Sequence, residues 1–166
     1  MKLKMLVILL LILSLVACSS KSNTIEEAMI KANMEYSKIN YIKELPIDKR
    51  ALVFYENKEL IGVGLLKKVN KGWEWVIGSS TSDDSKAEIQ WAYSYVDESF
   101  PLVYGYIRND EISKITLEFR VKKYDTNLIK VDNKTLFYAL LDEPQNPPIT
   151  IRGYNNKEEE VYNSDN

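Results

Sequence analysis

The chain has 166 residues, no histidine, one cysteine and a formal charge of −2 at pH 7. This length fits one domain with a sizeable hydrophobic core. The absence of a basic excess argues against nucleic-acid binding, and the absence of histidine removes His-assisted nucleophiles and histidine-based zinc sites.

The first 17 residues have the three parts of a secretory signal peptide. Lys2 and Lys4 give a positive start, Met5 to Leu13 form an unbroken apolar run, and mostly small residues follow. The run is shorter than the about 20 residues that a membrane-spanning helix needs. We therefore expect residues 1–17 to be a cleaved leader, and no spanning anchor.

The leader ends in Leu15-Val16-Ala17-Cys18, which resembles the lipobox of bacterial lipoproteins. The resemblance implies cleavage between Ala17 and Cys18, and a diacylglyceryl group on the Cys18 thiol. Val16 departs from the more usual Ser or Ala at its position. Two acyl chains make a durable attachment, whereas one is marginal. The alternative is a cysteine that lies by chance near an ordinary cleavage site.

Residues 18–23 are expected to form the lipidated cysteine and a short polar tether. Thr24 then begins an amphipathic helix that we expect to end near Asn40. Thr24 and Glu27 have the spacing of a capping box. Apolar residues recur at helical spacing from Ile25 to Ile39.

After the helix, the pattern changes to short strands separated by turn residues. The first two, 50–55 and 60–69, are apolar on both faces, which predicts central strands covered on each side. Gly62 and Gly64 share a face and leave room for the helix or another close backbone. Gly78 to Lys86 is expected to be a loop. Further strands are predicted at 73–77, 88–96 (where a helix is the alternative), 102–108, 112–121, 128–131, 135–141, 149–154 and 159–162.

These elements predict an α+β fold. One N-terminal amphipathic helix would pack on a mostly antiparallel, highly bent β-sheet, or on two small sheets, of about nine short strands. We expect a single extracytoplasmic domain over residues 24–162, with a subdomain split near 79–86 left open. Residues 163–166 would form a frayed tail.

The likeness to lipoproteins extends beyond the lipobox. The tether, the IEEAM helix, GWEWVIG and YGYIRNDEI are similar to segments of small surface lipoproteins of Gram-positive-type bacteria. This resemblance implies attachment to the extracytoplasmic face of the cell membrane. It implies no activity, and it supplies no functional residue besides Cys18.

Aromatic residues at period two form a candidate binding face. They could stack on envelope sugars or grip a peptide. Equally, they could form the cross-strand pairs and the core of an antiparallel sheet. The residues are Trp73, Trp75, Trp91, Tyr93, Tyr95, Tyr104 and Tyr106.

Adjacent acidic residues are the remaining candidates for chemistry. A glycosidase needs two acids that face each other across a cleft, and solvated turn residues are the simpler interpretation. The loop from Ser82 to Ser85 is rich in oxygen ligands but lacks calcium-loop spacing, so we predict no metal and no cofactor. The acidic runs are Asp83-Asp84, Asp97-Glu98, Asp110-Glu111, Asp142-Glu143 and Glu158-Glu159-Glu160.

The sequence therefore predicts a lipid-anchored binding or interaction module at the cell envelope, held to the membrane through Cys18. Its expected partner is an envelope protein, peptide or glycan, and no catalytic residue is assigned. The alternative is an envelope hydrolase that uses paired carboxylates.

Overall fold

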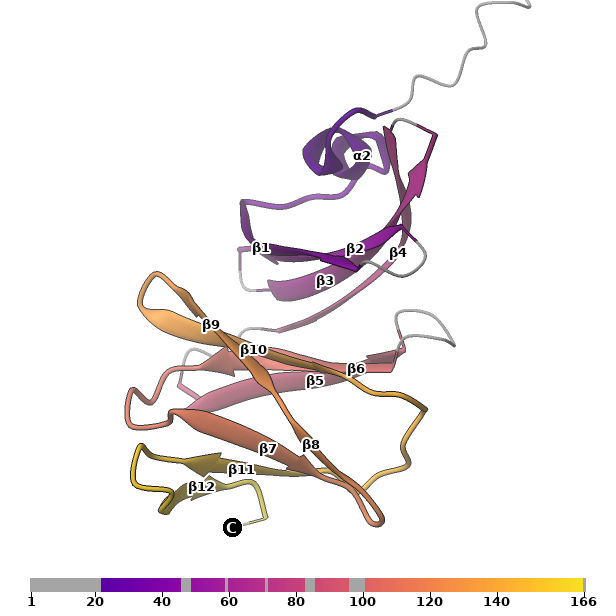
Figure 1. Cartoon of the computed structure of the whole chain (residues 1–166). Coiled ribbons are helices and arrows are strands. Elements are labelled where there is room, and N and C mark those ends of the chain that lie inside the picture. The colour runs from indigo at the N-terminus through magenta and orange to yellow at the C-terminus, as the bar shows by residue number, and fades with distance from the viewer. Residues whose placement is uncertain are drawn as a thin grey trace, which may run out of the picture.

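The computed structural model describes residues 22–45, 49–58, 60–70, 72–82, 86–95 and 101–165. The predicted leader, Cys18 and most of the tether lie outside these residues. One short helix, α2 (Ile25–Lys31), and three four-stranded antiparallel sheets are stacked in layers (Figure 1). The order is α2, then sheet A, sheet B and sheet C, whose strands are given below. In the described part of the chain, no helix is long and apolar enough to cross a membrane.

Sheet A is a meander that follows the chain order β1-β2-β3-β4. Its two central strands are buried along most of their length, as predicted, because α2 covers one face and sheet B covers the other. Val53 packs under α2, whereas the neighbouring Phe54 points into the core shared with sheet B. The strands are β1 (Lys38–Leu45), β2 (Arg50–Asn57), β3 (Leu60–Val69) and β4 (Gly72–Ser82).

Sheet B lies in the middle of the stack and has the order β5-β6-β10-β9. Along β6, Leu102, Tyr104 and Tyr106 pack toward sheet A, while Val103 and Ile107 pack toward sheet C. Alternate residues of the same strand therefore serve two separate cores. The strands are β5 (Ile89–Tyr95), β6 (Pro101–Ile107), β9 (Asn127–Val131) and β10 (Lys134–Leu140).

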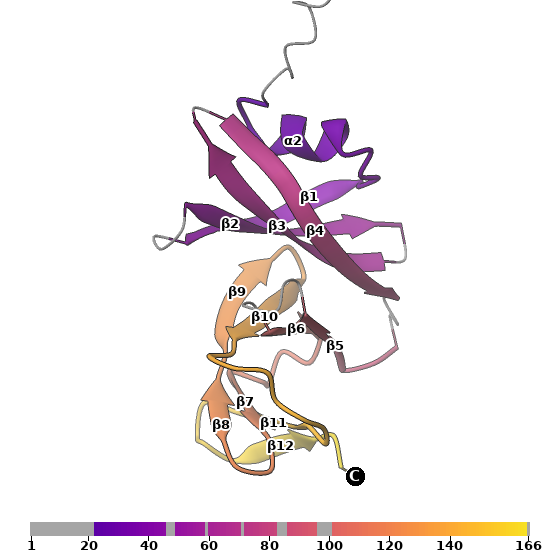
Figure 2. The same ribbon diagram turned by 90° about the vertical axis from the view of Figure 1, so that its right-hand side faces the viewer.

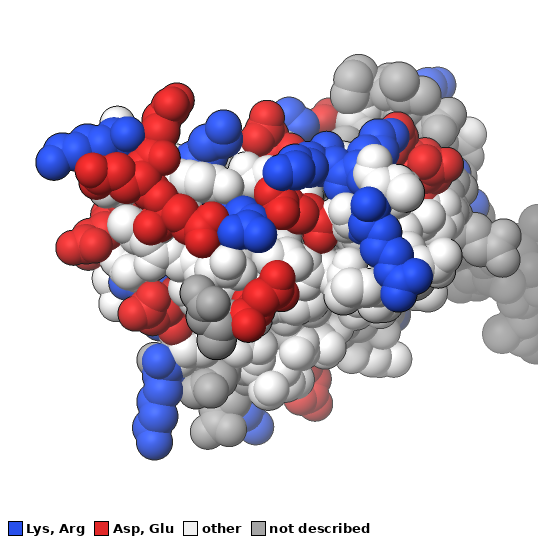
Figure 3. Space-filling model, turned by 90° about the horizontal axis from the view of Figure 1, so that it is seen from below, with Lys and Arg blue, Asp and Glu red and all other residues white. Residues whose placement is uncertain are grey.

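Sheet C has the order β12-β11-β7-β8 and buries one face against sheet B. On β7, Ile115 and Leu117 point into the core, and Glu118 lies on the outer face, where Arg152 binds it at 2.9 Å. Basic and acidic side chains are interspersed on the side of the molecule that Figure 3 shows. The strands are β7 (Lys114–Glu118), β8 (Lys123–Asp125), β11 (Thr150–Tyr154) and β12 (Glu160–Asn163).

The predicted α+β class is wrong, because the described chain is mainly β. The expected helix over 24–40 ends after seven residues, so that α2 spans only Ile25–Lys31. Asn33, with φ of 54°, donates its N–H to the Ile30 carbonyl, and the Met34 N–H bonds to the Met29 carbonyl. These two bonds form a Schellman motif, which stops a helix.

The residues after this motif form β1, a strand that was expected to be helix. A register shift between Ile39 and Tyr41 breaks the alternation of β1. As a result Ile39 and Ile42 both pack on the α2 side of sheet A, at a spacing that resembles a helix. The sequence pattern was ambiguous at this point, and strand pairing with β2 decided it.

The beginning of α2 was predicted correctly. The Thr24 side chain accepts a hydrogen bond from the Glu27 N–H at 3.1 Å. The Glu27 carboxylate reaches back to the Asn23 N–H at 2.6 Å. The first bond satisfies a backbone donor that the helix N-terminus leaves unpaired, and the second fixes the residue before the N-cap.

Candidate functional site

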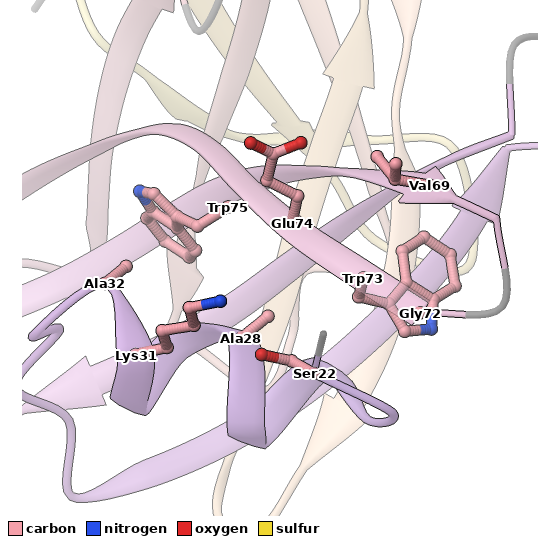
Figure 4. Close-up of a pocket in the computed structure, with 9 residues that line it drawn as sticks. All are labelled: Ser22, Ala28, Lys31, Ala32, Val69, Gly72, Trp73, Glu74 and Trp75. Atoms are coloured by element: carbon pink, nitrogen blue, oxygen red, sulfur yellow. The ribbon is translucent and has the colours of Figure 1, made fainter. Parts of the chain in front are cut away.

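A pocket of about 290 Å³ lies between α2 and β4. It is at the end of the layer stack where the described chain begins, opposite the C-terminus (Figure 1). Figure 4 shows its lining, which is Ser22, Ala28, Lys31, Ala32, Val69, Gly72, Trp73, Glu74 and Trp75.

The floor of the pocket is the first part of β4. Residues on a strand alternate between its two faces, so Trp73 and Trp75 lie on the side of sheet A that carries α2, where both are half-buried. Glu74 points the other way (Figure 4) and forms an ion pair with Lys67 at 3.7 Å. The sequence WEW thus supplies two indoles to one surface.

Ser22 closes one side of the pocket. The Trp73 N–H donates a hydrogen bond to the Ser22 carbonyl at 2.7 Å, in an isolated antiparallel bridge. This bond ties the segment before α2 to the edge of sheet A. The start of the described chain is therefore part of the pocket wall.

The position of Trp75 depends on two glycines, Gly64 on the neighbouring strand β3 and Gly78 on β4 itself. A Cβ at Gly64 would come within 2.0 Å of the indole, and one at Gly78 within 2.5 Å. At Gly62, the ring of Tyr55 fills the corresponding space. The room that Gly62 and Gly64 leave is thus taken by aromatic rings, where the helix or another backbone was expected.

The pocket combines apolar rings with hydrogen-bond donors. The Lys31 ammonium and the Ser22 hydroxyl lie among the lining side chains in Figure 4. The Lys68 ammonium lies 5.2 Å from the centre of the Trp73 ring, a cation–π contact. Such a surface suits a ligand with one apolar face and several hydrogen-bonding groups.

Of the seven aromatic residues of the predicted binding face, the structure brings only Trp73 and Trp75 together at this pocket. Trp91 and Tyr93 pack against the core between sheets B and C. Tyr104 and Tyr106 are fully buried in the core between sheets A and B. The side chain of Tyr95 lies outside the described part of the chain.

Tyr104 illustrates the core role of these tyrosines. Its hydroxyl donates to the Ser79 carbonyl at 3.3 Å, across the interface of sheets A and B. Burial raises the pKa of Tyr104 to about 12. The neutral Tyr104 phenol is therefore part of the packed core between sheets A and B.

The acidic pairs that the structure describes do not form one cluster. Asp83-Asp84 and Asp97-Glu98 lie outside the described residues, as does most of the Ser82–Ser85 loop. Asp110 and Glu111 are exposed in a turn that Asn109 caps, and Glu158 and Glu159 lie at the turn before β12, which begins at Glu160. Among the residues described, no group of three or more Cys, Asp or Glu side chains could hold a metal ion.

Two carboxylates, Asp142 and Glu118, have lowered pKa values because they accept hydrogen bonds from Lys or Arg side chains. Hydrogen bonds from Lys122 and Tyr124 lower the pKa of Asp142 to about 2. Lys123 and Arg152 lower the pKa of Glu118. A general acid needs a raised pKa, so these two groups are suited to ion pairing and not to proton donation.

The helix side of the pocket and Ser22 were not predicted as parts of a site. Ala28, Lys31 and Ala32 lie at helical spacing and could have been identified as one helix face. Ser22 gave no signal, because its bond to Trp73 joins segments 51 residues apart in the sequence.

A second hollow, of about 320 Å³, lies near sheet C. Two loops form it, so no strand or helix fixes its lining side chains. The lining residues are Phe119, Arg120, Val121, Glu143, Pro144, Gln145 and Asn146.

Comparisons of the chain with protein-family models, with curated proteins and with solved structures found no match. The functional assignment must therefore come from the residues themselves.

Proposed function

We propose that this chain is a lipid-anchored binding module on the extracytoplasmic face of the cell membrane, with the pocket between α2 and β4 as its ligand site. The observation that carries the proposal is the place of this pocket. Ser22 forms part of its wall and lies four residues after Cys18 in the sequence. Four residues span at most about 14 Å, so a diacylglyceryl group on Cys18 would hold the pocket next to the bilayer.

The ligand that best fits the pocket is a sugar ring of an envelope glycan. A volume of about 290 Å³ is at the lower end of the range for ligand pockets, so it admits a single ring or side chain. A pyranose ring has an apolar face that can stack on an indole, and hydroxyls that accept bonds from Ser22 and Lys31. A peptide side chain is the alternative occupant.

The anchor is tested by Cys18→Ala. We expect the variant to lose incorporation of a fatty-acid analogue and to keep its leader, because Cys18 is the single cysteine of the chain. The wild-type chain, labelled in parallel, is the control. Equal labelling of the variant and the wild type would refute the anchor.

The pocket is tested by intrinsic fluorescence of the full chain in detergent. Two of its three tryptophans line the pocket, so a glycan fragment that stacks there should change the emission. Lys31→Met should weaken binding by about 10- to 100-fold, since a hydrogen bond to a charged group contributes about 1.5–3 kcal/mol. Lys43→Met on β1, which is exposed and does not line the pocket, is the matched control. If envelope peptides change the emission and glycan fragments do not, the ligand of the pocket is a peptide and not a sugar.

A further inference from the structure

The outer edge of β4 is an exposed backbone edge of sheet A that lies outside the candidate pocket. β4 is the last strand of sheet A, so β3 is its one neighbour within the sheet. Ser22 pairs with the outer edge at Trp73. After a register shift, the segment from Ile77 to Ser82 pairs with β3 without interruption. Among the described residues, no strand pairs with the outer edge of that segment.

This segment lacks the features that usually keep sheet edges apart. Edge strands are normally protected by charges, especially Lys, or by proline. The segment 77–82 reads IGSSTS and has neither. Val76, just before the segment, is 45% exposed, and Ile77, its first residue, is 43% exposed. Figure 2 shows β4 in the foreground, with no strand in front of it.

The other edge strands differ from β4. Charged side chains occur on β1, β8, β9 and β12, for example Lys43 on β1 and Lys130 on β9. β5 is also uncharged, but its Trp91 and Tyr93 pack against the core between sheets B and C. Among the described residues, β4 is therefore the sheet edge whose uncharged stretch carries mostly small side chains.

We propose that two copies of this chain pair through the outer edge of β4, antiparallel, so that their A sheets form one continuous eight-stranded sheet. A two-fold axis through Ser80 places Ser80 opposite Ser80 of the second copy, and Gly78 opposite Ser82. No like charges face each other in this register, and small neutral side chains meet across the axis. Glu74, the single charged residue of β4, lies outside the paired segment. Such an interface is self-complementary, as a two-fold dimer requires.

The symmetry has a second consequence. A two-fold axis perpendicular to a continuous sheet keeps both α2 helices, and both Ser22 residues, on the same face. Both chains could then be attached to one bilayer. This point rests on the proposed lipid anchor, whereas the pairing of the edges does not.

The dimer is tested with the full chain in detergent, by measuring its molar mass with light scattering. We expect a dimer for the wild type and a monomer for Ser80→Lys, because each copy would bring a lysine to the axis. Ser80 is exposed, so the substitution disturbs no core contact, and circular dichroism checks that the variant is folded. Val121→Lys is the matched control, since Val121 is 90% exposed in the turn between β7 and β8, and it should stay dimeric.

Thiol cross-linking in membranes gives the independent measurement. Ser80→Cys should yield a cross-linked dimer with a short bifunctional reagent, whereas Val121→Cys and the wild type should not. A monomeric wild type, or a dimer that neither Ser80→Lys dissociates nor Ser80→Cys cross-links, would overturn the proposal. A cross-link from Ser80→Cys to a different protein would show that a foreign strand occupies the edge instead. Fatty-acid labelling of the same samples separates failure of the dimer from failure of the anchor.

Discussion

The indole of Trp75 lies against Gly64 on the neighbouring strand β3, so closely that a Cβ there would come within 2.0 Å of the ring. Real Cβ atoms do not approach other atoms so closely, and a side chain at position 64 would therefore displace the indole. The glycine thus positions one wall of the candidate pocket.

We expect Gly64→Ala to lower the free energy of unfolding by about 1–3 kcal/mol, the usual cost of overpacking. In a Trp75→Ala background, the same substitution should cost less than about 1 kcal/mol, because the ring that it strikes is gone. Urea unfolding of the four variants of this double-mutant cycle measures the difference. Equal costs in the two backgrounds would contradict the assigned contact.

Gly105→Ala should be more damaging than Gly64→Ala. A Cβ at Gly105 would meet the backbone carbonyl oxygen of Gln90 at 2.0 Å and the Cα of Trp91 at 2.8 Å. An indole can swing aside, whereas a paired backbone cannot move without breaking the β5–β6 ladder. We expect a loss above about 3 kcal/mol, measured by the same unfolding experiment, and a milder loss would show that β5 can shift.

The ion pair between Lys134 and Glu56 should stabilise the contact between sheets A and B. The Lys134 Nζ atom lies 2.6 Å from Glu56 Oε1 and 4.2 Å from the centre of the Tyr106 ring. The Lys134 side chain is 15% exposed and that of Glu56 is 22% exposed. Lys134→Met should cost about 1–3 kcal/mol, because a half-buried carboxylate is left without its cation; the loss for a fully buried pair is about 3–5 kcal/mol.

The pair between Lys38 and Asp132 is the matched control, since it also joins sheet A to the β9–β10 hairpin of sheet B. Its side chains are 42% and 67% exposed. Lys38→Met should therefore cost less than about 1 kcal/mol. If thermal unfolding shows the same loss for both variants, burial does not determine the strength of these pairs.

Asp142 should contribute to stability at neutral pH and lose this contribution in acid. Its pKa falls from the ordinary 3.8 to about 2, chiefly through the Lys122 hydrogen bond and then through the Tyr124 hydroxyl. Because the folded state favours the charged form, this contribution is complete above about pH 4 and is lost as the pH falls toward 2. Lys122→Met should move the pKa back toward 3.8, by more than Tyr124→Phe does. Carbon-detected NMR titration of the carboxyl group measures both, and an unmoved pKa in Lys122→Met would disprove the cause.

Tyr104 should contribute to folding stability up to pH 10 and lose this contribution in alkali. Burial raises its pKa from 10.0 to about 12, so the folded state favours the neutral phenol. This contribution is complete below pH 10 and is lost as the pH rises from 10 to 12. Tyr104→Phe should cost roughly 0.5–1.5 kcal/mol at neutral pH, through the lost bond to Ser79, and should flatten the alkaline decline. Tyr154→Phe on sheet C is the control, and an alkaline profile identical to that of the wild type would refute the role of Tyr104.

Most of the strands could be predicted, because turn residues in the sequence mark where they begin and end. β3 has the predicted limits, since turn residues stand on both sides of an apolar run. β1 was missed because its bulge mimics helical spacing, and β8 has only three residues and no pattern. β4 continues to Ser82 through residues that were expected to be loop, because β3 supplies a pairing partner over its whole length.

The number of sheets could not be predicted. β10 pairs with β6, and β11 pairs with β7, although each pair is separated by 25 or more residues. Such distant pairings leave no periodic signal in the sequence. Turn residues predict that a strand ends, but they do not predict which earlier strand it will join.

The candidate site was predicted in part. Trp73 and Trp75 could be recognised because they alternate on one strand. Tyr104 has the same spacing with Tyr106, yet both are in the core. Their strand lies in the middle of a sheet with two covered faces, where period two no longer distinguishes inside from outside.

Sheet B shares its residues between two hydrophobic interiors, because Leu136 on β10 faces sheet A while the adjacent Phe137 faces sheet C. A protease cut between β6 and β7 would leave neither fragment with a closed interior, since each would hold only half of the middle layer. Heating should likewise open both interiors in a single transition. Insertions and deletions are therefore best tolerated in the outer turns, and a shortened relative without the last two strands would have to cover the exposed face of β6 and β10 in another way.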